Sequence, residues 1–164
     1  MVKQGLNRTI AKRYLESVRR SWIPKHPNDD LSSICGHDAG CYLYIQYPDV
    51  DYIHFEWVVW LSGQPKGCIE VGLHFEKDHD GKKNDTILDA LEQYAKGSIV
   101  PVPKGTKFSR DFPNITWATR ICLLTVFVSS NDAESIKWAV NNMEIFCDIF
   151  NDGLDSLKAQ SIIP

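Results

Sequence analysis

The segment from Tyr52 to Glu76 constrains the fold most, because it alternates apolar and polar side chains on both sides of a turn. The triplet His-Phe-Glu occurs in it twice, at residues 54–56 and 74–76, around the turn-forming run Ser62-Gly63-Gln64-Pro65-Lys66-Gly67. Alternation with a period of two is typical of strands that bury one face. The connection is too short for a crossover helix, so the two strands are predicted to pair antiparallel.

Alternation also assigns each side chain of this hairpin to a face. The predicted core face is wholly apolar: Phe55, Trp57, Val59, Leu61, Ile69, Val71, Leu73 and Phe75. A turn centred near residues 64 and 65 makes opposed residue numbers sum to about 130, which pairs each histidine with a glutamate across the ladder. His54 then faces Glu76, and Glu56 faces His74. A preceding turn centred on Val50 adds Tyr42, Tyr44 and Gln46 to the second face.

The chemistry of the second face leaves three alternatives open. It is a solvated sheet face, which alternation produces automatically and which we favour as the commonest case. It is a surface for a ligand or partner, formed by Tyr42, Tyr44, His54, Glu56, Trp60, Glu70, His74 and Glu76. Or it is a zinc or manganese site with His54, Glu56, His74 and Glu76 as ligands. On the first two alternatives the protein has no cofactor.

Two further arrangements of possible ligands are weaker. A metal-dependent nuclease core has acids on its second and third strands, for which Glu56 and Glu70 qualify, and a lysine two residues after the second acid. That position holds Gly72. Cys35, His37 and Cys41 lie close together in the sequence, but no second Cys/His pair follows to complete a zinc site. We therefore expect a polar loop there.

The rest of the chain supplies helices and further strands. Apolar residues at helical spacing predict three helices. The first covers 7–22, and the second is capped by Asn84 or Asp85 and ends at Gly97. The third is long and follows an Asn131–Glu134 capping box. Strands are predicted at 41–47 and 115–128, with a short edge strand near 107–112. The order α-β-β-β-α-(β)-β-α predicts one α+β domain over 1–164, a two-layer structure with helices on one face of a mainly antiparallel sheet.

Charge and cysteine content indicate the surroundings of the protein. The net charge is −3, but residues 1–25 carry seven basic residues and one acidic residue. This makes Arg13, Arg19 and Arg20 on the first helix candidates for nucleic-acid contact, or for docking on an acidic surface. Five cysteines without a pairing pattern suit reduced thiols, and no apolar run is long enough to cross a bilayer. We expect a cytoplasmic protein without a membrane partner.

Two patterns of elements resemble known families. The run "LHFEKDHDGKKNDTILDALEQ", followed by "TWATRICLLTVFVSSNDAESIKWAVNNMEIFCDIFNDGLDSL", is similar to an uncharacterised domain appended to bacterial restriction-modification and defence proteins. The order of elements also resembles that of type III secretion chaperones, which are small proteins that dimerise and hold partner segments. These resemblances imply a bacterial protein that binds another macromolecule, and they assign no site residue.

Three functions are therefore expected, in order. The first is a non-enzymatic binding or accessory protein that presents its sheet face to a protein partner or to a second copy of itself. The second is a metal-dependent enzyme, nuclease-like or hydrolytic, that uses the His/Glu groups of the central hairpin. The third is nucleic-acid contact through the basic first helix.

Overall fold

The structure is a computed structural model that describes residues 5–63, 66–76, 82–109 and 119–164. Its elements are three helices and six strands: α1 (Arg8–Trp22), β1 (Cys35–Gly36), β2 (Gly40–Gln46), β3 (Ile53–Trp60), β4 (Cys68–Phe75), α2 (Lys82–Gly97), β5 (Lys107–Ser109), β6 (Thr119–Val126) and α3 (Ala133–Ala159). The predicted α+β class is confirmed, with one additional two-residue strand, β1, inside the segment predicted to be a loop.

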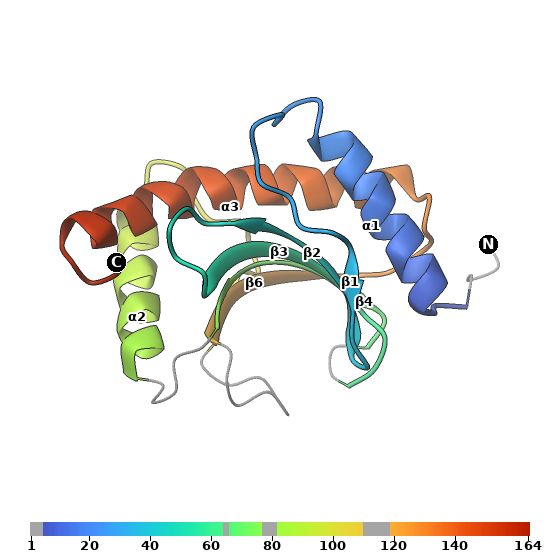
Figure 1. Cartoon of the computed structure of the whole chain (residues 1–164), viewed down its shortest axis with the longest axis horizontal. Helices are drawn as coiled ribbons and strands as arrows, with labels where there is room; N and C mark the ends of the chain where they lie inside the picture. The colour runs from blue at the N-terminus through green and yellow to red at the C-terminus, as the bar shows by residue number, and fades with distance from the viewer. Residues whose placement is uncertain (1–4, 64–65, 77–81, 110–118) are drawn as a thin grey trace.

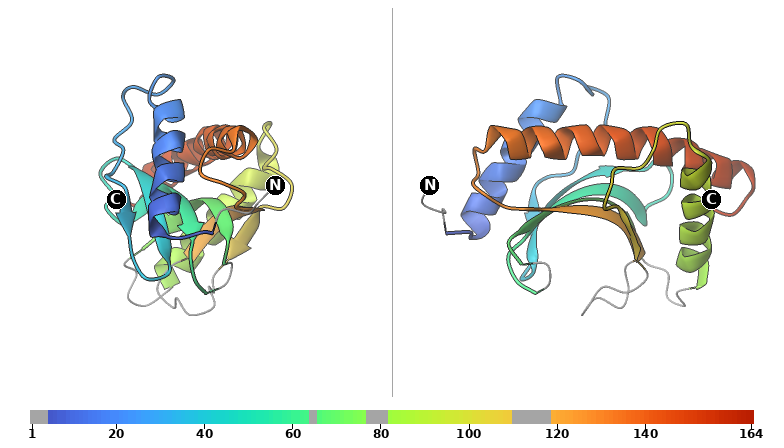
Figure 2. Two further views of the ribbon diagram at one scale, coloured as in Figure 1. Left: turned by 90° about the vertical axis from the view of Figure 1, so that its right-hand side faces the viewer. Right: turned by 180° about the vertical axis from the view of Figure 1, so that it is seen from behind.

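All six strands belong to one antiparallel sheet in the order β1-β2-β3-β4-β6-β5. The sheet is arched, and the long helix α3 crosses its convex side (Figures 1 and 2). Helix α1 packs beside one end of α3, whereas α2 stands near the other end (Figure 1). The opposite side of the sheet is therefore concave and faces away from α3.

The hydrophobic core lies between the convex side of the sheet and the helices. The odd-numbered residues of β3 and β4 enter it as predicted, and Trp57 is completely buried there. The Trp57 indole Nε1 donates a hydrogen bond to the carbonyl oxygen of Ala139 on α3 at 3.0 Å. On the α1 side, the Tyr14 hydroxyl donates to the carbonyl oxygen of Ser135 at 3.0 Å. Large apolar surfaces and a few satisfied polar groups thus hold the helices on this face.

The start of α1 is as predicted, and those of α2 and α3 are not. Asn7 caps α1 by accepting from the backbone N–H of Ile10 at 3.0 Å. Helix α2 already begins at Lys82, so Asn84 lies inside it, where its side-chain nitrogen donates to the carbonyl oxygen of Phe75 at 3.2 Å. The N-cap of α3 is Asp132, one residue beyond the predicted Asn131, and its side chain makes no capping hydrogen bond.

The predicted edge strand is present in part, since β5 covers Lys107–Ser109, and residues 110–118 lie outside the described part of the chain. All five cysteines are free thiols. Among the described residues, no helix is long and apolar enough to span a membrane.

The register of the central hairpin differs from the prediction by two residues. His54 is opposite His74 and Glu56 is opposite Gly72, so opposed residue numbers sum to 128 and the predicted His–Glu pairing is wrong. Gly63 and Gly67 both have positive φ, at 72° and 75°, and this turn geometry cannot be inferred from composition alone. Because the shift is two residues, every side chain keeps its predicted face. The β2–β3 pairing does match a turn centred on Val50, with Tyr44 opposite Glu56.

Candidate metal centre

The polar face of the hairpin is buried, although a solvated face was the favoured expectation. The relative exposures are 6% for His54, 6% for Glu56, 0% for Glu70 and 5% for His74. A solvated face is therefore wrong for these four residues. Burial of so many ionisable groups is costly unless they are paired with one another or with an ion.

His54, Glu56 and His74 line a pocket of about 690 Å³ on the concave side of the sheet, together with Glu76. Tyr42, Tyr44 and Trp60, which belong to the ligand surface expected from the sequence, contribute aromatic rings to its lining. His37 and Asp38 from the β1–β2 turn also line it. A volume of this size accommodates a small organic molecule, since typical ligand pockets measure roughly 300–1,000 Å³.

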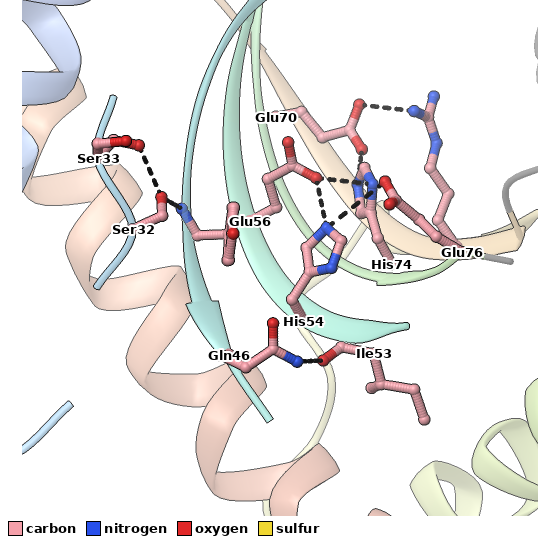
Figure 3. Close-up of polar contacts among 11 residues, drawn as sticks. Ser32, Ser33, Gln46, Ile53, His54, Glu56, Glu70, His74 and Glu76 are labelled. Carbon is pink, nitrogen blue, oxygen red and sulfur yellow. Dashed lines mark hydrogen bonds and ion pairs between the residues drawn. The ribbon is translucent and has the colours of Figure 1, made fainter. Parts of the chain in front are cut away.

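Four side chains in this pocket direct donor atoms toward one another: His54, Glu56, His74 and Glu76 (Figure 3). The Glu56 Oε2 atom lies 3.1 Å from His54 Nε2 and 2.9 Å from His74 Nδ1. Glu76 Oε1 lies 3.7 Å from His54 Nε2. All four donor atoms lie within 4.8 Å of one another.

These separations suit one transition-metal ion. With metal–ligand bonds of about 2.0–2.1 Å, donor atoms around a tetrahedral ion are about 3.3 Å apart. The donor set of two imidazoles and two carboxylates is one that zinc, manganese and related divalent ions accept. The four residues of the predicted metal site are therefore brought together as a single cluster.

Gly72 makes this arrangement sterically feasible. It occupies the position opposite Glu56 on β4, and a Cβ atom there would lie 3.1 Å from His74 Nε2 and 3.2 Å from His74 Cδ2. The His74 ring thus lies over the space that a side chain at residue 72 would occupy. The same Cβ would lie 3.0 Å from the carbonyl oxygen of Ile121, so a side chain at residue 72 would require the ring or the neighbouring strand to shift by a few tenths of an ångström.

Glu70 holds the second nitrogen of His74. Its Oε1 atom lies 2.9 Å from His74 Nε2, while its Oε2 atom accepts from Trp60 Nε1 at 2.8 Å and lies 3.3 Å from Arg120 Nη1. Both oxygens of Glu70 therefore have partners, which makes Glu70 a support for His74 rather than a metal ligand. A carboxylate behind a histidine is the usual way in which a metal-binding imidazole is oriented.

The electrostatics show that this cluster attracts a positive charge at its centre. Burial alone lowers the pKa of His74, but the carboxylates of Glu56 and Glu70 outweigh it and raise that pKa to about 10. Burial likewise favours neutral Glu56, yet His74 and His54 hold the pKa of its carboxyl well below the usual range. In the metal-free protein a proton on His74 supplies the positive charge, with both ring nitrogens acting as donors.

Arg120 is a site residue that the sequence analysis missed. Arg120 belongs to β6, where it lies opposite His74 of β4. It is 2% exposed, and its guanidinium carbon lies 5.4 Å from the centre of the Trp60 ring. An arginine inside an otherwise apolar strand was the available signal. His37 and Gly72 were noted in the sequence without these roles, and neither could be assigned before the register was known.

The three arginines proposed for nucleic-acid contact are not part of this pocket. Arg13, Arg19 and Arg20 belong to α1, which packs on the helical side of the sheet. Arg13 and Arg20 are exposed, and Arg20 pairs with Glu16 at 3.3 Å. These three arginines are therefore separate from the His/Glu cluster, although Arg8 at the start of the same helix contacts His37 and Asp38 of the pocket lining.

Comparisons of the chain with protein families, with curated proteins and with solved structures find no match. The two resemblances drawn from the sequence thus stay expectations, and function is argued from the site.

Proposed function

We propose that the protein is a metal-dependent enzyme in which His54, Glu56, His74 and Glu76 bind one divalent transition-metal ion, such as zinc or manganese. The proposed reaction class is hydrolysis of a small substrate in the adjoining pocket. The observation that carries this proposal is the convergence of four donor atoms within 4.8 Å at a pocket of about 690 Å³.

The surroundings of the donors support a built site over an accidental cluster. His74 is oriented by Glu70, and Glu70 is in turn fixed by Trp60 and Arg120. Catalytic zinc sites commonly use two histidines and one carboxylate as protein ligands and leave a further position open. His54, Glu56 and His74, which are all buried, are the natural permanent ligands.

Glu76 differs from the other three donors in a way that suits catalysis. Its side chain is 34% exposed, whereas those of His54, Glu56 and His74 are 8% exposed or less. A bound ion would supply a polarised or deprotonated water to the pocket. With His54, Glu56 and His74 holding an ion, Glu76 would be the carboxylate placed to accept a proton from that water.

Burial supports this proposal over a flat partner surface. A surface for a macromolecule presents its central side chains to the partner, but here the ionisable groups lie at the base of a pocket. Small-molecule chemistry fits such a shape better. Binding of a protein partner or a second copy remains a prediction from the sequence.

Metal content tests the proposal directly. Protein purified without chelator and without a histidine tag is expected to hold about one zinc or manganese ion per chain by elemental analysis. After stripping with EDTA, adding back the ion at a hundredfold excess over its Kd is expected to stabilise the fold by about 2.7 kcal/mol. Hydrolysis of p-nitrophenyl acetate should disappear on stripping and return on reloading.

Variants separate the donors from the rest of the pocket. His54→Ala and His74→Ala are expected to lose the ion, whereas the control His37→Ala alters a histidine that lines the same pocket outside the donor set and should keep it. The proposal fails when native protein carries no metal and stripped wild-type protein binds neither zinc nor manganese in a calorimetric titration. Stripped wild-type protein keeps this test valid even where an alanine variant does not fold.

A further inference from the structure

An aromatic wall runs from the mouth of the pocket to the metal centre. The rings of His37 and Tyr42 have centroids 5.6 Å apart, those of Tyr42 and Tyr44 are stacked at 6.4 Å with an interplanar angle of 20°, and those of Tyr44 and His54 are 4.9 Å apart. Tyr42 and Tyr44 are half-buried and occupy one face of β2. Their ring surfaces form a continuous wall that apolar and cationic groups favour.

The charges around this wall are predominantly negative. Among the described residues that line the pocket, Asp38, Asp51, Glu56 and Glu76 are acidic, and Arg120 and the histidines His37, His54 and His74 are basic. His54 and His74 lie against Glu56, and Arg8 of α1 lies 3.8 Å from Asp38, so the acidic groups are in modest excess. Arg120 is buried against Glu70, and its positive charge is largely offset there. A pocket of this sign attracts cations and repels phosphates and carboxylates.

We infer that the ligand of this pocket is a small organic cation: an ammonium group on an aromatic body that lies against Tyr42 and Tyr44. The acidic residues stabilise the ammonium group, and the tyrosine rings contact the body through stacking and cation–π attraction. The same charge argues against nucleic acid as the substrate, since a phosphate backbone would meet the acidic lining.

This inference rests on the proposed function only where it makes the organic cation the substrate of the metal centre. Binding itself needs the wall and the acidic lining, which are present without an ion. The two ideas can therefore fail separately.

Three probes that share one ring and differ in charge test the inference. Benzylamine, which is cationic at neutral pH, benzyl alcohol and benzoate are titrated into EDTA-stripped protein while amide chemical shifts are followed by NMR. Benzylamine is expected to bind about tenfold more tightly than benzyl alcohol, with benzoate weakest, because cation–π and ionic attraction act on the amine alone. The largest shifts should map to β2 and to the β1–β2 turn.

Matched substitutions complete the test. Tyr44→Leu is expected to weaken benzylamine about fivefold, whereas Tyr94→Leu, at an exposed tyrosine of α2 outside this pocket, should leave its affinity unchanged. Equal or tighter binding of benzoate to the stripped protein, or an unchanged affinity in Tyr44→Leu, overturns the inference. If benzoate binds, and only to zinc-loaded protein, the inference of an organic cation is overturned and the metal centre is supported. If benzylamine binds to protein that never accepts a metal, the inference is supported and the proposed function fails.

Discussion

At the scale of single residues, the properties of His74 follow from its neighbours. Its two ring nitrogens lie 2.9 Å from carboxylate oxygens of Glu56 and Glu70, which come from different strands. The Nδ1 atom, which faces Glu56, is available to an ion only in exchange for a proton. The Nε2 atom is held by Glu70, so this glutamate sets the orientation in which His74 meets a ligand.

Glu70→Gln tests this role of Glu70. The amide keeps the shape of the side chain but removes the charge that fixes His74 and Arg120, so we expect zinc affinity to fall about 10- to 100-fold with unchanged stoichiometry. Calorimetric titration of stripped, folded protein measures it. Glu92→Gln, on α2 and paired with Lys96 at 3.3 Å, is the matched control with no expected effect. Equal zinc affinity in Glu70→Gln and wild type would show that Glu70 does not position His74.

At the scale of elements, the alternation in β3 and β4 was sufficient to predict which side chains share a face. It was sufficient because the sheet carries helices on one side, and a period of two then separates core from non-core residues without knowledge of the partner strand. Register was not predictable to the same degree. It depends on the backbone at Gly63 and Gly67, and several turn conformations are compatible with those residues.

The burial of the polar face was not predictable from β3 and β4 alone. A row of His and Glu side chains has the same composition on a solvated face as in a pocket. What distinguishes the two is the arch of the sheet and the neighbouring residues His37, Tyr42 and Arg120, which come from β1–β2 and from β6. Those contacts are distant in sequence, and no local pattern encodes them.

The contact between β3 and α3 gives a prediction at this scale. Trp57→Phe removes the hydrogen bond to Ala139 and leaves unfilled volume in the core, so we expect the free energy of unfolding to fall by about 1–3 kcal/mol. Urea unfolding measures the change. Because Trp57 points away from the pocket, zinc stoichiometry should be unaffected. Loss of zinc binding in folded Trp57→Phe would contradict the separation of the two faces.

At the scale of the whole molecule, α1, α3 and the core occupy one side of the sheet, α2 stands at its end, and the ionisable cluster occupies the other side. Among the described elements, the sheet ends in short strands on both sides: β1 has two residues and β5 has three. Stability from the core and charge chemistry from the pocket are thus supplied by different faces of the same strands.

The pH dependence of folding is the prediction for the molecule as a whole. The pKa of His74 is raised from 6.5 to about 10, so in metal-free protein its stabilising effect is complete below pH 6.5 and is lost as the pH rises toward 10. The pKa of Glu56 is lowered, so its effect is present above pH 4.5 and is lost at more acidic pH. These two groups together favour maximal stability between about pH 4.5 and 6.5.

Urea unfolding in EDTA at pH 5.5, 7.5 and 9.5 measures this dependence. We expect stability to fall from pH 5.5 to 9.5 in the wild type and to change less in His74→Gln, which has no proton to lose. With zinc bound the fall should also be smaller, because the ion replaces the proton. A flat profile in the metal-free wild type, or the same slope in His74→Gln, would contradict the assignment.

The absent side chain at residue 72 links backbone alignment to chemistry. Sliding β4 by two residues against β3 would leave every residue on its own side of the sheet, and the core would remain as apolar as before. Yet Gly72 would no longer lie opposite Glu56, and His74, which now reaches Glu56 diagonally across that gap, would meet different neighbours on β3. For this hairpin, two alignments that are equally acceptable to the core bring different donor atoms together.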